Sequence, residues 1–139
     1  MSDSDRPLRC ALGMLASDKH NKGLRMIAKM LRDEGVEVIY LGEYNTARTI
    51  ARAVADEDVD LLGISAFTGN YVLKLQELLD EMKEFGVGDV PVMLGGLIHI
   101  DDEPALYAAG VDAIFGPHTG RDDVLAYVTK LKSNLVDVS

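Results

Sequence analysis

The stretch LRCALGMLASDKHNKGLRMIAKMLRDEGVEVIYL, residues 8–41, decides the fold because it contains a complete strand–helix–strand unit. Residues 8–15 are almost wholly apolar, as in a short strand that is buried on both faces. A polar segment, residues 17–23, follows as a loop, and a helix with one apolar face then runs until Gly35 ends it. The apolar positions of that helix are Leu24, Ile27, Ala28 and Leu31. Residues 36–41 form the second apolar strand.

The same alternation of strands and helices continues along the chain. Asn45 is expected to cap the second helix, and the third helix is expected to end near Gly86. Further strands are predicted at 60–66, 90–94 and 111–115, and further helices at 104–109 and 121–132. Continuously apolar strands separated by helices predict a parallel sheet that is covered on both sides. We therefore predict a flavodoxin-like α/β sandwich of three layers, with five parallel strands in the order 2-1-3-4-5.

The totals favour one compact domain over residues 1–139, with a core of about 8–132 and flexible ends, including a frayed tail at 133–139. The net charge is −9, and no stretch of Lys and Arg is dense enough to follow a phosphate backbone or an anionic membrane. Cys10 is the only cysteine, which excludes an internal disulfide and a cysteine-built metal site and suits a reducing compartment. Residues 1–9 do not resemble a signal peptide, so we expect a cytoplasmic protein.

The unusual residues of the chain gather where the predicted strands end. In open parallel sheets, ligands bind outside the carboxyl ends of the strands, at the switch point between strands 1 and 3. The residues at that edge are Asp18, His20 and Gly23 after strand 1, Ser65 to Gly69 after strand 3, Gly95 and Gly96 after strand 4, and Gly116 to Gly120 after strand 5.

Four motifs at this edge resemble those of the B12-binding domains of coenzyme B12-dependent mutases and methionine synthase. Residues 18–23 (DKHNKG) fit D-x-H-x-x-G, and residues 63–67 (GISAF) resemble G-x-S-x-L. Gly95-Gly96 matches the double glycine, and residues 115–119 (FGPHT) resemble F-G-P-G-T. Each motif alone has an ordinary explanation as a turn or a strand end, but four in the same order make a specific match to the methylmalonyl-CoA mutase type.

The resemblance implies that the chain binds cobalamin with its own base displaced from cobalt and with His20 as the lower metal ligand. Asp18 would accept the other ring N–H of His20, as carboxylates do at many metal-bound histidines. The displaced nucleotide tail would enter a slot beside the sheet. The residues implied to bind it are Gly23 near the loop, Gly63, Gly95 and Gly96 for room, Ser65 for a hydrogen bond to the ring nitrogen, Phe67 and Phe115 for an apolar wall, and Gly116 and Thr119 for the polar parts.

Some positions depart from the family pattern. Met14 stands where many methylmalonyl-CoA mutase domains carry a lysine, Phe67 replaces the leucine of G-x-S-x-L, and His118 replaces a glycine. These departures bear on the substrate class more than on cofactor binding. His99 and His118 lack metal-ligand spacing and are expected to be ordinary polar residues, and Cys10 is expected to be a small core residue.

The resemblance further implies an isomerase subunit that uses adenosylcobalamin, with no catalytic residue of its own. It would need a large barrel-type mutase subunit that holds most of an acyl-CoA substrate, of the methylmalonyl-CoA or 2-hydroxyacyl-CoA type. The alternative is a corrinoid carrier for methyl transfer or a B12 sensor. Such proteins usually place a helical domain ahead of this fold, whereas residues 1–7 precede the first strand here. A receiver-like signalling domain would want an aspartate at the end of strand 3, where Ser65 stands.

Overall fold

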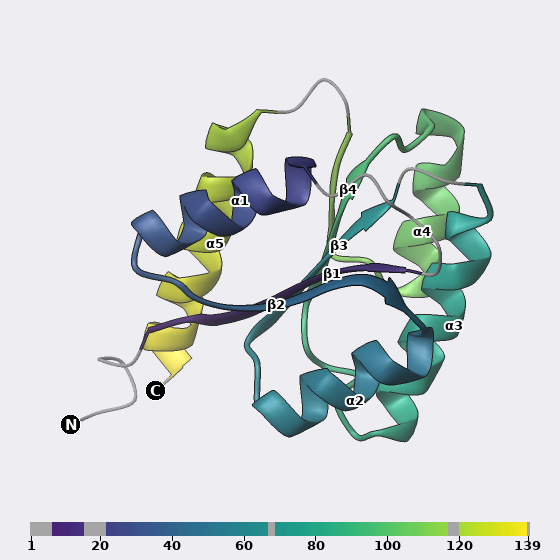
Figure 1. The fold of residues 1–139 in the computed structure, drawn as a ribbon, viewed down its shortest axis with the longest axis horizontal. Coiled ribbons are helices and arrows are strands. Elements are labelled where there is room, and N and C mark those ends of the chain that lie inside the picture. The colour runs from purple at the N-terminus through teal and green to yellow at the C-terminus, as the bar shows by residue number, and fades with distance from the viewer. Residues whose placement is uncertain (1–6, 16–21, 67–68, 117–119, 139) are drawn as a thin grey trace.

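The computed structural model describes residues 7–15, 22–66, 69–116 and 120–138. Its strands are β1 (Arg9–Leu15), β2 (Glu37–Asn45), β3 (Leu61–Ala66), β4 (Val92–Gly96) and β5 (Ala113–Phe115). Its helices are α1 (Lys22–Asp33), α2 (Ala47–Glu57), α3 (Tyr71–Glu84), α4 (Glu103–Ala109) and α5 (Arg121–Val138), with a short 3-10 helix, η2 (Ile100–Asp102), before α4. The described strands form one parallel sheet in the order β2-β1-β3-β4-β5, which confirms the predicted fold (Figure 1).

The sheet is the middle layer, and its two faces are covered by different helices. On one face, the buried side chains of α2, α3 and α4 pack against Ala11, Leu62 and Leu94. On the other face, those of α1 and α5 pack against Leu12 and Met93. Figure 1 shows the two groups of helices on opposite sides of the sheet. Because both faces are covered, every residue of β3 is buried, which accounts for a sequence that is apolar except for Ser65.

Glycines end two of the helices as their positions in the sequence predict. Gly35 follows α1 with φ +87°, and the N–H of Val36 donates to the carbonyl of Leu31 at 2.9 Å. Gly86 follows α3 with φ +77°, and the N–H of Val87 donates to the carbonyl of Met82 at 2.8 Å. Positive φ is accessible to glycine without a Cβ clash, so the chain can reverse there and satisfy the last carbonyls.

The expected cap of the second helix is wrong by one residue. Thr46, and not Asn45, is the N-cap of α2: its hydroxyl accepts the N–H of Thr49 at 3.1 Å, and the Thr49 hydroxyl accepts the N–H of Thr46 at 2.9 Å. Asn45 is the last residue of β2. Its side-chain amide donates to the carbonyls of Gly42 at 2.9 Å and Met14 at 3.1 Å, so it holds the end of β2 against β1.

The fourth strand and the last helix also differ from the predicted boundaries. β4 begins at Val92 and includes both glycines, because Gly95 pairs with Ser65 and Gly96 pairs with Ala66 in the ladder. The last helix continues to Val138, whereas the sequence analysis expected a frayed tail from residue 133. Residues 121–138 contain neither glycine nor proline, so nothing in that sequence ends the helix earlier.

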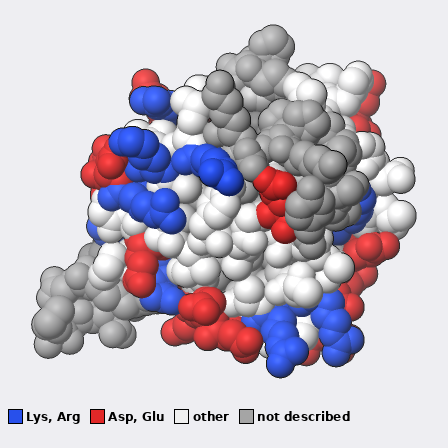
Figure 2. Space-filling model, in the orientation of Figure 1, with Lys and Arg blue, Asp and Glu red and all other residues white. Residues whose placement is uncertain are grey.

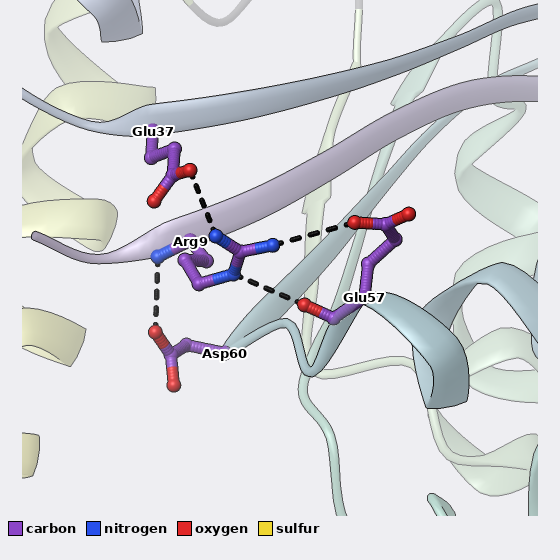
Figure 3. A network of polar contacts seen from close by, with 4 residues as sticks. All are labelled: Arg9, Glu37, Glu57 and Asp60. Carbon is purple, nitrogen blue, oxygen red and sulfur yellow. Dashed lines mark hydrogen bonds and ion pairs between the residues drawn. The ribbon is translucent and has the colours of Figure 1, made fainter.

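Arg9 joins four parts of the chain at the amino end of the sheet (Figure 3). Because the strands are parallel, this end is opposite the edge that carries the motifs. Its guanidinium lies 2.8 Å from the carboxylate of Glu37 on β2, and its Nε donates to the carbonyl of Glu57 on α2 at 3.0 Å. Its backbone N–H donates to the carboxylate of Asp60 at 2.9 Å. The Arg9 side chain is only 25% exposed, so these contacts are partly shielded from water.

Cys10 is a core residue, as predicted. It is fully buried, and burial raises the pKa of its thiol to about 12, so the thiol stays protonated near neutral pH.

The basic side chains on the surface are unevenly distributed. In Figure 2 they gather over α1, which contributes the exposed Arg25, Lys29 and Arg32. No helix in the described ranges is long and apolar enough to cross a membrane.

Replacing Arg9 with Met should lower the free energy of unfolding by about 1–2 kcal/mol, because Glu37 and Glu57 would lose their contacts with a partly shielded guanidinium, while the backbone N–H that Asp60 accepts would remain. Urea denaturation measures this change. Lys29→Met is the matched control: its ion pair with Asp33 is exposed on one helix, and its loss should cost less than about 0.5 kcal/mol. Equal effects of the two substitutions would contradict the structural role given to Arg9.

Candidate functional site

A cavity of about 300 Å³ lies between the sheet and the helices α1 and α5, at the carboxyl ends of the strands. It lies on the face that α1 and α5 cover, whereas α2 and α3 pack closely against each other on the opposite face. Seven residues predicted from the sequence motifs line it: Gly23, Gly63, Ser65, Gly95, Gly96, Phe115 and Gly116. The fold thus brings together residues from four separate segments of the chain. Their role in binding a cofactor stays a prediction.

The remaining predicted site residues cannot be compared with this cavity. Asp18, His20, Phe67 and Thr119 lie outside the described residues. Among the residues that the structure does describe, no group of three or more His, Cys, Asp or Glu side chains is placed to hold a metal ion. A metal-binding role for His20 therefore remains a prediction from the motif.

The inner wall of the cavity is formed by alternate residues of β3 and β4. Gly63 and Ser65 are two residues apart on β3 and point to the same face, and Gly95 pairs with Ser65 across the ladder. Ser65 is the one buried polar side chain in the described part of the chain, with 7% exposure. Its hydroxyl is therefore the main hydrogen-bonding side chain that the sheet offers to a molecule in the cavity.

The three glycines of this wall have different physical roles. At Gly95, an added Cβ would meet only the carbonyl oxygen of Phe115, at an ordinary 3.5 Å. At Gly63, it would lie 2.6 Å from Cδ2 of Leu12 and 2.9 Å from Cε of Met93, so the room above this glycine is already filled by two side chains. Gly63 thus allows close packing of the floor, whereas Gly95 leaves open space in the cavity.

Gly96 is required by the backbone itself. Its φ is +121°, and a Cβ there would lie 2.1 Å from the carbonyl oxygen of Ala66, closer than any real contact. The next residue, Leu97, donates its N–H to the same carbonyl at 3.0 Å. No side chain fits between the ends of β3 and β4 at this point, which explains the second glycine of the pair.

The rest of the described cavity lining is mostly apolar and includes residues that the motifs did not indicate. Met30 of α1 is 9% exposed and Met93 of β4 is 5% exposed. Phe115 packs edge-to-face on Tyr127 of α5, with ring centroids 5.8 Å apart and planes at 65°. Burial, with the nearby carboxylate of Asp112, raises the pKa of Tyr127 to about 12, so this ring stays neutral. Strand alternation from Gly95 could have indicated Met93, since the two are on the same face.

A polar network anchors the loop that follows Gly96. The hydroxyl of Tyr71, at the start of α3, donates to the carboxylate of Asp102 and accepts the backbone N–H of His99 at 2.9 Å. The Nδ1 of His99 accepts the N–H of Asp101 at 3.1 Å, so His99 is a polar loop residue, as expected. No local sequence pattern could have found this network, because Tyr71 and Asp102 are 31 positions apart.

The B12 binding domain family model matches residues 8–126 of the chain. The chain belongs to this B12-binding family. It is 35% identical over 126 residues to the pivalyl-CoA mutase small subunit of Xanthobacter autotrophicus, covering 91% of this chain and 84% of that protein. It is 33% identical over 125 residues to the 2-hydroxyisobutanoyl-CoA mutase small subunit of Aquincola tertiaricarbonis, covering 90% of this chain and 92% of that protein. This B12-binding chain therefore has small subunits of acyl-CoA mutases among its relatives.

Other relatives contain the same domain inside a longer chain. The ethylmalonyl-CoA mutase of Cereibacter sphaeroides is 37% identical over 112 residues, which are 81% of this B12-binding chain but 17% of that mutase. A crystal structure of a cobalamin-binding protein from Desulfitobacterium hafniense has a TM-score of 0.78 at 20% identity, covering 91% of this chain and 60% of that one. A receiver domain from Vibrio parahaemolyticus, at 13% identity and a TM-score of 0.72, shares the fold alone.

Replacing Gly96 with Ala should lower the free energy of unfolding by about 1–3 kcal/mol, because the methyl group would be forced onto the Ala66 carbonyl at a positive φ. Gly95→Ala is the adjacent control, since its methyl group has room, and should change stability by less than about 1 kcal/mol. Chemical denaturation of both variants makes the comparison. A Gly96→Ala protein as stable as Gly95→Ala would contradict the close approach of β3 and β4 described above.

Proposed function

We propose that this B12-binding chain is the small subunit of a heteromeric, adenosylcobalamin-dependent acyl-CoA mutase that rearranges a carbon skeleton. The observation that carries the proposal is the cavity beside β3 and β4, whose wall contains residues of all four family motifs. The mutase small subunits among the relatives support the same role. The substrate would be an acyl-CoA of the methylmalonyl-CoA or 2-hydroxyacyl-CoA type.

The described residues fit the nucleotide tail of cobalamin. A flat, mostly apolar ring with one free ring nitrogen needs an apolar slot that contains one hydrogen-bonding group, and Ser65 with the ring of Phe115 supplies that combination. Gly95 leaves open space beside them. Arg121, at the first position of α5, is the one charged residue among those that line the cavity in the described ranges, and it suits the phosphate of the tail.

In this proposal, His20 binds cobalt from below and Asp18 orients its imidazole. The support comes from the motif and from chain connectivity. β1 ends at Leu15 and α1 begins at Lys22, and Gly23, next to that start, lines the cavity. The segment that carries both residues therefore leads directly to the cavity. A carboxylate beside a metal-bound imidazole fixes its tautomer and raises its basicity.

Adenosylcobalamin, when bound, supplies the radical chemistry of the rearrangement. The task of this chain is to hold the tail in the cavity, to keep water from the buried ring and to present the cobalt face to a partner. The described residues offer no pair of carboxylates in the cavity wall for acid–base chemistry. Catalytic groups that touch the acyl-CoA would therefore belong to the partner.

The partner in this proposal is a large barrel-type subunit that covers the upper face of the corrin and binds the acyl-CoA. Two kinds of relative support it: separate small subunits of about this length, and longer mutases in which the matched region is 16–19% of the chain. The same domain thus occurs both apart from and joined to a larger mutase portion. We propose that this chain works in the cytoplasm with a separate large subunit.

Replacing His20 with Ala should remove the spectral signature of imidazole-bound cobalamin, because the imidazole that the motif assigns to cobalt would be missing. Absorption spectra and electron paramagnetic resonance of the reduced complex measure this. Asp18→Asn should weaken the bond and lower mutase activity while some binding remains. His99→Ala is the matched control, because His99 is exposed at the same edge but serves only its own loop. An unchanged His20→Ala spectrum would remove His20 from the coordination sphere.

The mutase role is tested by isolating the tagged full chain from its native host with adenosylcobalamin present. A stable complex with a large mutase subunit is expected, and the complex should isomerise at least one member of a panel of branched acyl-CoA and 2-hydroxyacyl-CoA thioesters. The chain without that subunit should be inactive on every thioester. Cobalamin binding together with methyl transfer and without any isomerisation would instead establish a corrinoid carrier.

A further inference from the structure

Among the described residues that line the cavity, only Ser65 and Arg121 have polar side chains. Ser65 provides one hydroxyl there, and Arg121 stands at the exposed start of α5. Met30, Met93 and Phe115 line the same cavity as Ser65 and present apolar or weakly polar surfaces to it. A molecule that enters the cavity must therefore leave water while gaining little side-chain hydrogen bonding from the described residues in return.

The surfaces that Met93 and Phe115 contribute to the cavity are closely packed against neighbouring side chains. Cε of Met93 and Cδ2 of Leu12 occupy the room above Gly63, as the distances of 2.9 Å and 2.6 Å from a hypothetical Cβ there show. The ring of Phe115 is fixed by its edge-to-face contact with Tyr127. Methionine thioethers and an aromatic ring provide polarizable contacts for a flat heterocycle and little capacity for hydrogen bonds.

This composition distinguishes between the bases that natural corrinoids carry. A dimethylbenzimidazole has one free ring nitrogen, which the Ser65 hydroxyl can satisfy, and two methyl groups that suit an apolar wall. A purine has additional ring nitrogens, and adenine adds an exocyclic amino group. In a cavity lined by Met30, Met93 and Phe115, those groups would lose their hydrogen bonds to water, and the described lining offers no side chain beyond Ser65 and Arg121 to replace them.

We infer that this cavity selects corrinoids with a benzimidazole base over those with a purine base, and that Met30 and Met93 determine the selectivity. The inference rests on the proposed function, because it takes the cavity as the site of the displaced base. We expect wild-type protein to bind cobalamin at least about tenfold more tightly than the analogue with adenine as its base, a factor that corresponds to about 1.4 kcal/mol.

The experiment measures dissociation constants of the full chain for three compounds: cobalamin, its adenine-containing analogue, and cobinamide, which lacks the nucleotide. Met30→Gln and Met93→Gln each place an amide in the wall at nearly constant side-chain length. Both substitutions should bring the dissociation constants for cobalamin and the adenine analogue closer together. The dissociation constant for cobinamide should stay within about twofold of the wild-type value. In each free cofactor the base is bound to cobalt, and detaching it costs free energy. This cost is the same for wild type and variants, so it does not affect the comparison of their ratios.

Met26→Gln is the matched control, since Met26 also lines the cavity but is 54% exposed at its mouth, and its ratio should equal that of wild type. Thermal unfolding shows which variants are folded. For the wild-type ratio, each dissociation constant is first corrected for the free energy of detaching the base from cobalt in the free cofactor, so that this ratio tests the inference even where a variant is unfolded. Equal or tighter wild-type binding of the adenine analogue would overturn the inference, as would an unchanged ratio in both folded variants.

Failure of the proposed function gives a different result. If cobalamin bound no more tightly than cobinamide, the base would not occupy the cavity, and the displaced-base arrangement itself would be wrong. If none of the three compounds bound, the assignment of the cofactor to this chain would be wrong. A clear preference for cobalamin over cobinamide, with no discrimination against adenine, would leave the proposed function intact and remove only the selectivity.

Discussion

The parallel pairing of β3 with β1 on one side and β4 on the other is the constraint on which the site depends. In this register, Ser65 lies beside Met14 and Gly95, so the ends of three strands meet at one edge. Both faces of these strands are buried, which confines polar chemistry to that edge. The closeness of the strands there also forces glycine at Gly96, where the Ala66 carbonyl leaves no room for a side chain.

The two faces of the sheet are used differently. On the face of α2, α3 and α4, large apolar side chains such as Leu75, Leu78 and Met82 are fully buried and fill the space. On the face of α1 and α5, the cavity leaves the side chains that line it short of packing partners, which lowers the stability that this face contributes. A bound ligand would restore those contacts, so the incompletely packed face is the one suited to binding.

Two polar networks at opposite edges of the sheet have different tasks, one in the stability of the fold and the other in the shape of the site. At the amino edge, Arg9 connects β1, β2, α2 and the residue before β3. At the carboxyl edge, Tyr71 connects the start of α3 to the loop between β4 and α4 through Asp102 and His99. The first network holds the strands in place, and the second holds the loop beside Gly96, so changes at one edge need not disturb the other.

The sequence by itself determined the alternation of strands and helices, because periodicity is a local property, and five such units indicated the strand order. The seven motif residues that line the cavity were indicated by the resemblance of four motifs to a known family. The sequence did not give the ends of these elements correctly. Thr46, and not Asn45, caps α2, and β4 includes both glycines. Only the tertiary structure decided which face is hollow and that Met93 fills the room above Gly63. Those features depend on how side-chain volumes from distant segments fit together, and no local pattern encodes that fit.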